Sequence, residues 1–132
     1  MPPKDLVLCV DDEPTLLRTF PIVLARAGFR VAVAEDGIAG LKAFVRLQNE
    51  VCLVLADIIM PAMSGIDMAE TILYLAPQTK ILLMSAYSDD EVIGRQVRRS
   101  GLPLISKPFN LATLVEQIRS MVATQDPASA VR

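Results

Sequence analysis

Histidine is absent from this sequence of 132 residues, and only two cysteines are present. Without histidine, the chain has no Ser-His-Asp triad, no histidine metal ligand and no phospho-histidine of its own. Cys9 and Cys52 both fall within apolar runs, and we interpret them as small buried side chains rather than a disulfide or a metal-binding pair. Any chemistry must therefore come from other polar groups.

Long apolar runs and a strong charge of one sign are also missing. Although 52% of the residues are hydrophobic, no apolar run approaches the ~20 residues that span a bilayer. Residues 1–5 lack the apolar segment of a signal peptide, so we expect a cytoplasmic protein with no membrane partner. The net charge of −2, from 13 basic and 15 acidic residues, gives no electrostatic footprint for nucleic acid, and we expect no direct nucleic-acid binding.

Short apolar runs alternate five times with amphipathic helical patterns. The runs predict strands at 6–10, 30–34, 51–57, 80–84 and 102–106, and the helical patterns begin near Pro14, Asp36, Ile66, Ser88 and Asn110. Such alternation implies an α/β fold, in which a parallel sheet is covered on both faces by helices. We expect one folded domain over residues 1–123 and a flexible tail or linker at 124–132.

Two details of the first helix and one of the last can be predicted from single residues. Pro21 lies inside the first helical pattern, and we expect a kink rather than a break because the apolar stripe continues past it. Gly28 is a plausible C-cap of that helix, and Asn110 is expected to cap the last helix.

Polar side chains stand where four of the predicted strands end. Asp11 and Asp12 follow the first strand, Asp57 ends the third, Ser85 follows the fourth and Lys107 follows the fifth. Open α/β sheets bind ligands at the carboxyl ends of their strands. Clustered carboxylates repel one another, and a cation removes that cost. Mg²⁺ prefers such oxygen ligands together with a phosphate oxygen, so the set predicts a metal and phosphoryl crevice.

The residue types also suggest separate roles within this crevice. Asp57 stands alone after the most apolar strand and is the best candidate for a nucleophile that forms an aspartyl phosphate. Lys107 offers a compact positive charge and Ser85 a hydroxyl donor for phosphoryl oxygens. Taken singly, each residue is more often structural: a helix cap, a turn residue or a solvated charge. Their joint occurrence at successive strand ends favours the functional interpretation.

Five stretches of the sequence carry a recognisable pattern: Val10 to Pro14, Leu55 to Pro61, Ser64-Gly65, Met84 to Ala86, and Lys107 to Phe109. In this order and spacing they resemble the receiver domain of response regulators in two-component signalling, over about residues 5–123. The resemblance implies a flavodoxin-like fold of five parallel strands in order 2-1-3-4-5 with five helices. It also implies that Asp57 accepts a phosphoryl group from a histidine kinase or a histidine phosphotransfer protein.

The same resemblance implies a metal site. Asp12 and Asp57 would bind Mg²⁺ (or Mn²⁺) directly, together with the backbone carbonyl of Ile59, and Asp11 would act through a water molecule. Ile59 and Tyr87 stand two residues past the phosphoacceptor and two past the serine. Both are bulky, and we hypothesise that they restrict the approach of water and lengthen the lifetime of the phosphorylated state.

The resemblance implies a switch as well. Ser85 would hold the phosphoryl group, Lys107 would pair with it, and Lys107-Pro108 would carry a cis peptide bond. Phosphorylation would draw Ser85 inward and reshape the face of the fourth helix, fifth strand and fifth helix, where an effector or a second copy of the chain would bind. Leu104 stands where the family often has an aromatic residue, so the aromatic half of the switch departs from the pattern.

We therefore predict a phosphoacceptor signalling domain rather than a turnover enzyme, with self-catalysed phosphotransfer and slow autodephosphorylation only. One alternative is a metal-dependent phosphatase with an Asp nucleophile, but such enzymes usually need a second Asp where Ile59 stands, and a cap domain. Another is a non-phosphorylated scaffold of the same fold, although such scaffolds commonly lose an acidic residue or the lysine. The stretch 84–89 also resembles receivers attached to hybrid histidine kinases.

Overall fold

Strands and helices alternate along the whole described chain. The computed structural model describes residues 4–86 and 90–123, so the expected tail at 124–132 lies outside the described residues. The strands are β1 (Leu6–Val10), β2 (Arg30–Ala34), β3 (Val51–Asp57), β4 (Ile81–Ser85) and β5 (Leu104–Ser106). The helices are α1 (Pro14–Arg26), α2 (Gly37–Leu47), α3 (Gly65–Leu75), α4 (Glu91–Ser100) and α5 (Leu111–Ala123). None of the described helices is long and apolar enough to cross a membrane.

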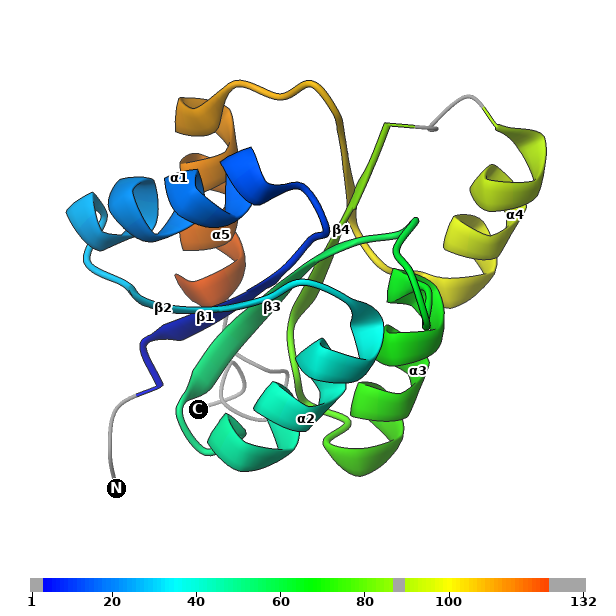
Figure 1. Ribbon diagram of the computed structural model, residues 1–132, viewed down its shortest axis with the longest axis horizontal. Coiled ribbons are helices and arrows are strands. Elements are labelled where there is room, and N and C mark those ends of the chain that lie inside the picture. Colours follow the sequence, from blue (N-terminus) through cyan, green and yellow to red (C-terminus); the bar gives the residue numbers. More distant parts are fainter. Residues whose placement is uncertain (1–3, 87–89, 124–132) are drawn as a thin grey trace, which may run out of the picture.

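The five strands form one parallel sheet in the order β2-β1-β3-β4-β5. Helices α1 and α5 cover one face, and α2, α3 and α4 cover the other (Figure 1). Successive residues of β3 point to opposite cores: Leu53 and Leu55 pack with α1 and α5, whereas Val54 and Ala56 pack with α2 and α3. Because both faces are buried, the strands read as continuous apolar runs. The predicted doubly wound fold and strand order are confirmed.

The last two strands differ from their predicted bounds. β5 begins at Leu104 rather than Leu102, and β4 spans Ile81–Ser85 rather than 80–84. Pro103 explains the shorter β5, because proline has no N–H and contributes to the ladder only through its carbonyl, which accepts from the Leu83 N–H at 2.9 Å. The fifth strand is therefore a short edge strand.

The predicted helix starts are confirmed within one residue, except for the start expected at 88. Helix α1 continues through Pro21 to Arg26, and a kink at Pro21 stays a prediction. Its C-cap is Ala27, and Gly28 follows at φ +97°, a left-handed conformation that glycine adopts at little cost. The Asn110 side chain accepts from two amides at the start of α5, as predicted. For α4 the cap is Asp90; the expected start at 88 lies outside the described residues.

Candidate functional site

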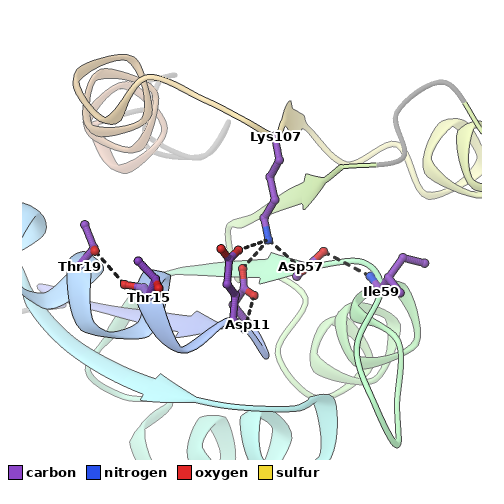
Figure 2. Close-up of polar contacts among 7 residues, drawn as sticks. Asp11, Thr15, Thr19, Asp57, Ile59 and Lys107 are labelled. Carbon is purple, nitrogen blue, oxygen red and sulfur yellow. Dashed lines mark hydrogen bonds and ion pairs between the residues drawn. The ribbon is translucent and has the colours of Figure 1, made fainter.

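Two buried carboxylates and one ammonium group meet at the carboxyl ends of the strands. Asp11 follows β1 and Asp57 ends β3, which is the neighbouring strand. Lys107 reaches both from the segment after β5 (Figure 2): its Nζ lies 2.8 Å from Asp11 Oδ2 and 3.0 Å from Asp57 Oδ2. The exposed fractions of these three side chains are 0% for Asp11, 10% for Asp57 and 14% for Lys107. Because these side chains are largely shielded from water, their ion pairs are weakly screened. The pairs therefore fix the relative positions of the three charged groups.

The second oxygen of each buried carboxylate is held by the backbone. Asp11 Oδ1 accepts from the Glu13 N–H at 2.9 Å, and Asp57 Oδ1 accepts from the Ile59 N–H at 3.3 Å. Each carboxylate therefore has a partner on both oxygens, and neither can rotate without losing one. This arrangement holds both groups in fixed orientations.

Asp12 completes an acidic cluster and differs from its neighbours. One carboxylate oxygen from each of Asp11, Asp12 and Asp57 lies within 4.8 Å of the others. Asp12 is exposed, and within 4–86 and 90–123 it takes part in no hydrogen bond or ion pair. Three hard oxygen donors at this spacing suit Mg²⁺, which takes one or two carboxylates and keeps several waters. Of the three, Asp12 has no partner among the described residues that an ion would have to displace.

The protonation properties of the cluster favour an added cation. Burial raises the pKa of Asp57 above its usual value, against the lowering effect of the Lys107 hydrogen bond, and the charge of Asp11 raises it further. For Lys107, burial acts to lower the pKa, but hydrogen bonds to Asp11 and Asp57 outweigh it and the pKa is raised. The ammonium is thus held charged, while the negative charge at Asp57 stays costly even beside Lys107, so an added cation would stabilise it.

The loop between β3 and α3 is folded back tightly against Asp57. The Gly65 N–H donates to the Ile58 carbonyl at 2.9 Å, and a Cβ added at Gly65 would overlap the backbone carbonyl of Asp57. Ala62 adopts φ +70°, and the flanking Met63 N–H donates to the Pro61 carbonyl at 2.7 Å in a three-residue turn. Such a turn is strained for a residue with a side chain. Holding the loop in this shape therefore costs free energy.

Ser85 and Lys107 are joined through the backbone. Ser85 is fully buried at the end of β4, whose Met84 is paired with Asp57 in the sheet. The Ser85 carbonyl accepts from the Lys107 N–H at 2.8 Å. Ser85 therefore lies at the same edge of the sheet as the carboxylates. The expected contact of its hydroxyl with a phosphoryl group stays a prediction.

The remaining expectations for the site differ in outcome. The Lys107-Pro108 bond is cis, as predicted. Ile59 contacts Asp57 through its N–H, and the expected role of its carbonyl as a metal ligand stays a prediction. Ile59 is 46% exposed, and Tyr87, the other bulky residue, lies outside the described residues.

Sequence reasoning missed one member of the cluster. Glu13 Oε2 lies 3.7 Å from Lys107 Nζ, although no role in the site was predicted for Glu13. This residue is the N-cap of α1, but its side chain makes no capping hydrogen bond. Its position directly after two site aspartates was the available signal.

Glu13 also faces a cavity of about 600 Å³ between the start of α1 and the start of α5. Most of the lining is apolar, and the charged groups are Glu13 and Lys107 at one end. The lining includes Leu16 and Thr19 of α1, and Phe109 and Leu111 near α5. The ring of Phe109 stacks on that of Phe20, with centroids 6.4 Å apart, so this wall of the cavity is anchored in the core.

Sequence and structure comparisons give the same family. The family model described as "Response regulator receiver domain" matches residues 7–119. Chemotaxis protein CheY of Treponema pallidum is 31% identical over 117 residues, which are 88% of this chain and 81% of that protein. DNA-binding response regulator MtrA of Mycolicibacterium smegmatis is 35% identical over 120 residues, which are 89% of this chain but only 50% of that protein.

A solved structure is similar in fold as well as in sequence. Response regulator protein TrrA of Thermotoga maritima, solved in complex with Mg²⁺ and BeF, is 30% identical, with a TM-score of 0.77, and the match covers 89% of this chain and 98% of that one. Together with the family match and the 2-1-3-4-5 sheet, this places the chain among the response regulator receiver domains, which act in two-component signalling.

Proposed function

We propose that the Asp57 carboxylate is the phosphoacceptor of this receiver domain. The observation that carries the proposal is the pairing of this buried carboxylate with Lys107 at 3.0 Å, in a cluster of three aspartates that could hold a metal ion. Asp11 has no exposed surface, and Asp12 is exposed and uncommitted. Of the three aspartates, only Asp57 is both partly exposed and paired with Lys107, whose charge can neutralise a phosphoryl group.

Mg²⁺ (or Mn²⁺) is the cofactor that the donor set fits best. Asp12 and Asp57 would hold the ion with the Ile59 carbonyl, and Asp11 would orient a bound water. The ion would neutralise charge on the phosphoryl oxygens. The TrrA structure contains Mg²⁺ and BeF, and the 30% identity of that chain supports the same pair of ligands here.

In the transfer itself, a carboxylate oxygen of Asp57 attacks phosphorus and the phosphorus–nitrogen bond of a phospho-histidine breaks. The imidazole leaves with the bonding electrons and takes up a proton, and Asp57 becomes an acyl phosphate. Lys107 then exchanges its Asp57 contact for a phosphoryl oxygen, and the Ser85 hydroxyl donates to another. These 132 residues contain no histidine, so the phospho-histidine lies outside them, on a histidine kinase or a histidine phosphotransfer protein.

We infer two binding surfaces, one for the phosphoryl donor and one for the protein that reads the phosphorylated state. The phospho-histidine donor would approach over the apolar cavity beside Lys107. The readout would pass from Ser85 and Lys107 to the face of α4, β5 and α5, where an effector or a second copy would bind. Because the chain spans only half of the DNA-binding relative MtrA, the absence of direct nucleic-acid binding stays a prediction for any longer protein that contains this domain.

Intact-mass measurement after incubation with acetyl phosphate and Mg²⁺ tests the proposal. We expect the wild-type chain to gain one phosphoryl group, and the gain to require the metal. Asp57→Ala should gain none, whereas Asp67→Ala, which removes an exposed aspartate of α3, should behave as wild type.

Two results would overturn the proposal. Uptake that persists in Asp57→Ala would place the acceptor elsewhere. Steady phosphate release from varied phosphate esters, with no phosphorylated chain accumulating, would favour the phosphatase alternative.

A further inference from the structure

A groove lies along β2, at the outer edge of the sheet. It has a volume of about 450 Å³ and is lined by β2, α1 and α2. Val33 and Ala34 of β2 form part of the lining, with Leu17 from α1 and Ala39 from α2. Because α1 and α2 cover opposite faces of the sheet (Figure 1), this β2 groove opens along the strand edge between them.

Within residues 4–86 and 90–123, no strand pairs with the outer edge of β2. β2 is the first strand of the sheet, and its described partner is β1. The Arg30 N–H donates to the Asp5 carbonyl, and the Ala34 carbonyl accepts from the Asp11 N–H. In a parallel ladder alternate residues bond to one neighbour, so the N–H and C=O groups of Val31 and Val33 point to the outer edge. These are the groups that an added strand would use.

The two edges of the sheet are protected differently. The other edge, β5, has only three residues and is followed directly by Lys107 and Pro108. β2 has five residues, and after Arg30 it contains neither a charge nor a proline. Val33 is 45% exposed. Natural edge strands usually carry a device that blocks pairing, and the absence of one along 31–34 indicates that this edge is used.

Charge indicates what the groove accepts. Lys42 and Arg46 stand one turn apart on the α2 wall, on the same face because they are four residues apart. Both are exposed, and neither forms an ion pair within the part of the chain that the structure describes. Glu35 is the single acidic residue of the lining. An occupant with a carboxylate toward α2 would therefore complement the groove.

We propose that the β2 groove binds an extended segment of a partner protein, which adds to the edge of β2 as a further strand and places an acidic side chain between Lys42 and Arg46. Flanking apolar side chains would cover Val33 and Leu17. A second copy of this chain fits less well, because a two-fold β2–β2 pairing would bring the same cationic groups together from both sides. This binding does not depend on phosphorylation at Asp57.

Amide NMR titration of the unphosphorylated full chain tests the proposal. The probe is the blocked pentapeptide acetyl-Thr-Val-Glu-Val-Thr-amide, which alternates for a strand and has one central carboxylate. We expect saturable shifts of the Val31 and Val33 amides and of those on α2 near Lys42 and Arg46. A matched peptide with lysine in the centre should bind about five- to tenfold more weakly, because two exposed ion pairs become repulsions.

A charge-swapped variant separates recognition from misfolding. Lys42→Glu/Arg46→Glu changes two exposed side chains, and an unchanged amide spectrum elsewhere would confirm its fold. It should prefer the lysine peptide. The proposal is overturned by equal binding of both peptides, by shifts that do not include Val31 and Val33, or by a wild-type dimer in sedimentation that already occupies the edge.

Discussion

The acidic end of β1 and β3 and the α4–β5 region, residues 91–106, are held to very different degrees. At the acidic end, Asp11 and Asp57 have partners on both carboxylate oxygens and lie over strands with almost no exposed surface. In the α4–β5 region, α4 buries only Val97 and packs chiefly against α3, and β5 buries only Ile105. Lys107 directly follows the α4–β5 region and links it to the acidic end, because its side chain pairs with Asp11 and Asp57.

The difference matches what the proposed function requires of each region. Phosphoryl transfer depends on charges that are already in position, and a packed strand end supplies them. A readout surface must move for a small free-energy change, and a helix with one buried side chain can do so. Leu104 packs with the α4 side of the core, so the leucine at this position provides apolar contact rather than an aromatic switch.

Deleting matched isoleucines should show the largest contrast in stability. Ile72 of α3 is fully buried, whereas Ile93 of α4 is half-buried. We expect Ile72→Ala to lower the free energy of unfolding by about 4 kcal/mol and Ile93→Ala by about 1 kcal/mol, because the first leaves a closed cavity. Urea denaturation measures both. Equal losses would mean that α4 is as firmly packed as α3.

Two glycines provide a second contrast. A methyl group at Gly65 would overlap the Asp57 carbonyl, whereas at Gly94 it would meet only the flexible end of Arg98, at 3.3 Å. We expect Gly65→Ala to cost about 3 kcal/mol and to slow phosphoryl uptake. Gly94→Ala should stabilise α4 by about 0.5 kcal/mol, since alanine is the better helix former. A harmless Gly65→Ala would contradict the tight loop at the site.

The cost of charge at Asp57 should appear in the pH dependence of stability. Because its pKa is raised in the fold, the folded chain binds this proton more tightly than the unfolded chain, and stability from this group is lost as pH rises through the folded pKa. Without Mg²⁺, Asp57→Asn should therefore be more stable than wild type at pH 7, with the difference shrinking toward the unfolded value of about 3.9.

Metal addition supplies the control for that measurement. Mg²⁺ should stabilise the wild type and leave Asp57→Asn nearly unchanged, because only the wild type gains a bound ion. An Asp57→Asn variant that is less stable than wild type at pH 7 in EDTA would show that the charged Asp57 carboxylate does not destabilise the fold.

The smallest expected effect concerns the lifetime of the phosphorylated chain. The exposed Ile59 side chain would hinder attacking water, so Ile59→Asn should lose its phosphoryl group several-fold faster. Val45→Asn is the control, since Val45 is 52% exposed on α2. Phosphate release from purified phosphorylated protein gives the rates. Faster loss from wild type than from Ile59→Asn would reverse the assigned role.

Much of this fold was predictable because apolar runs and helical stripes in the sequence indicate strands buried on both faces by helices. The carboxyl ends of those strands then place Asp11, Asp57 and Lys107 together. Contacts made by the loop geometry were not predictable. The left-handed Ala62 has no signature, since alanine is not a residue that favours φ > 0. Glu13 joins the ion cluster only because the turn into α1 brings its side chain within 3.7 Å of Lys107.

The identity of the acceptor carboxylate is the central claim, and chemical trapping tests it most directly. Borohydride reduces an acyl phosphate to an alcohol, so wild-type protein phosphorylated with acetyl phosphate and Mg²⁺ should carry homoserine at position 57 in peptide mass spectra. Lys107→Ala should carry much less, because the neutralising charge is lost. Homoserine at position 11 or 12, or none despite phosphoryl uptake, would contradict the account.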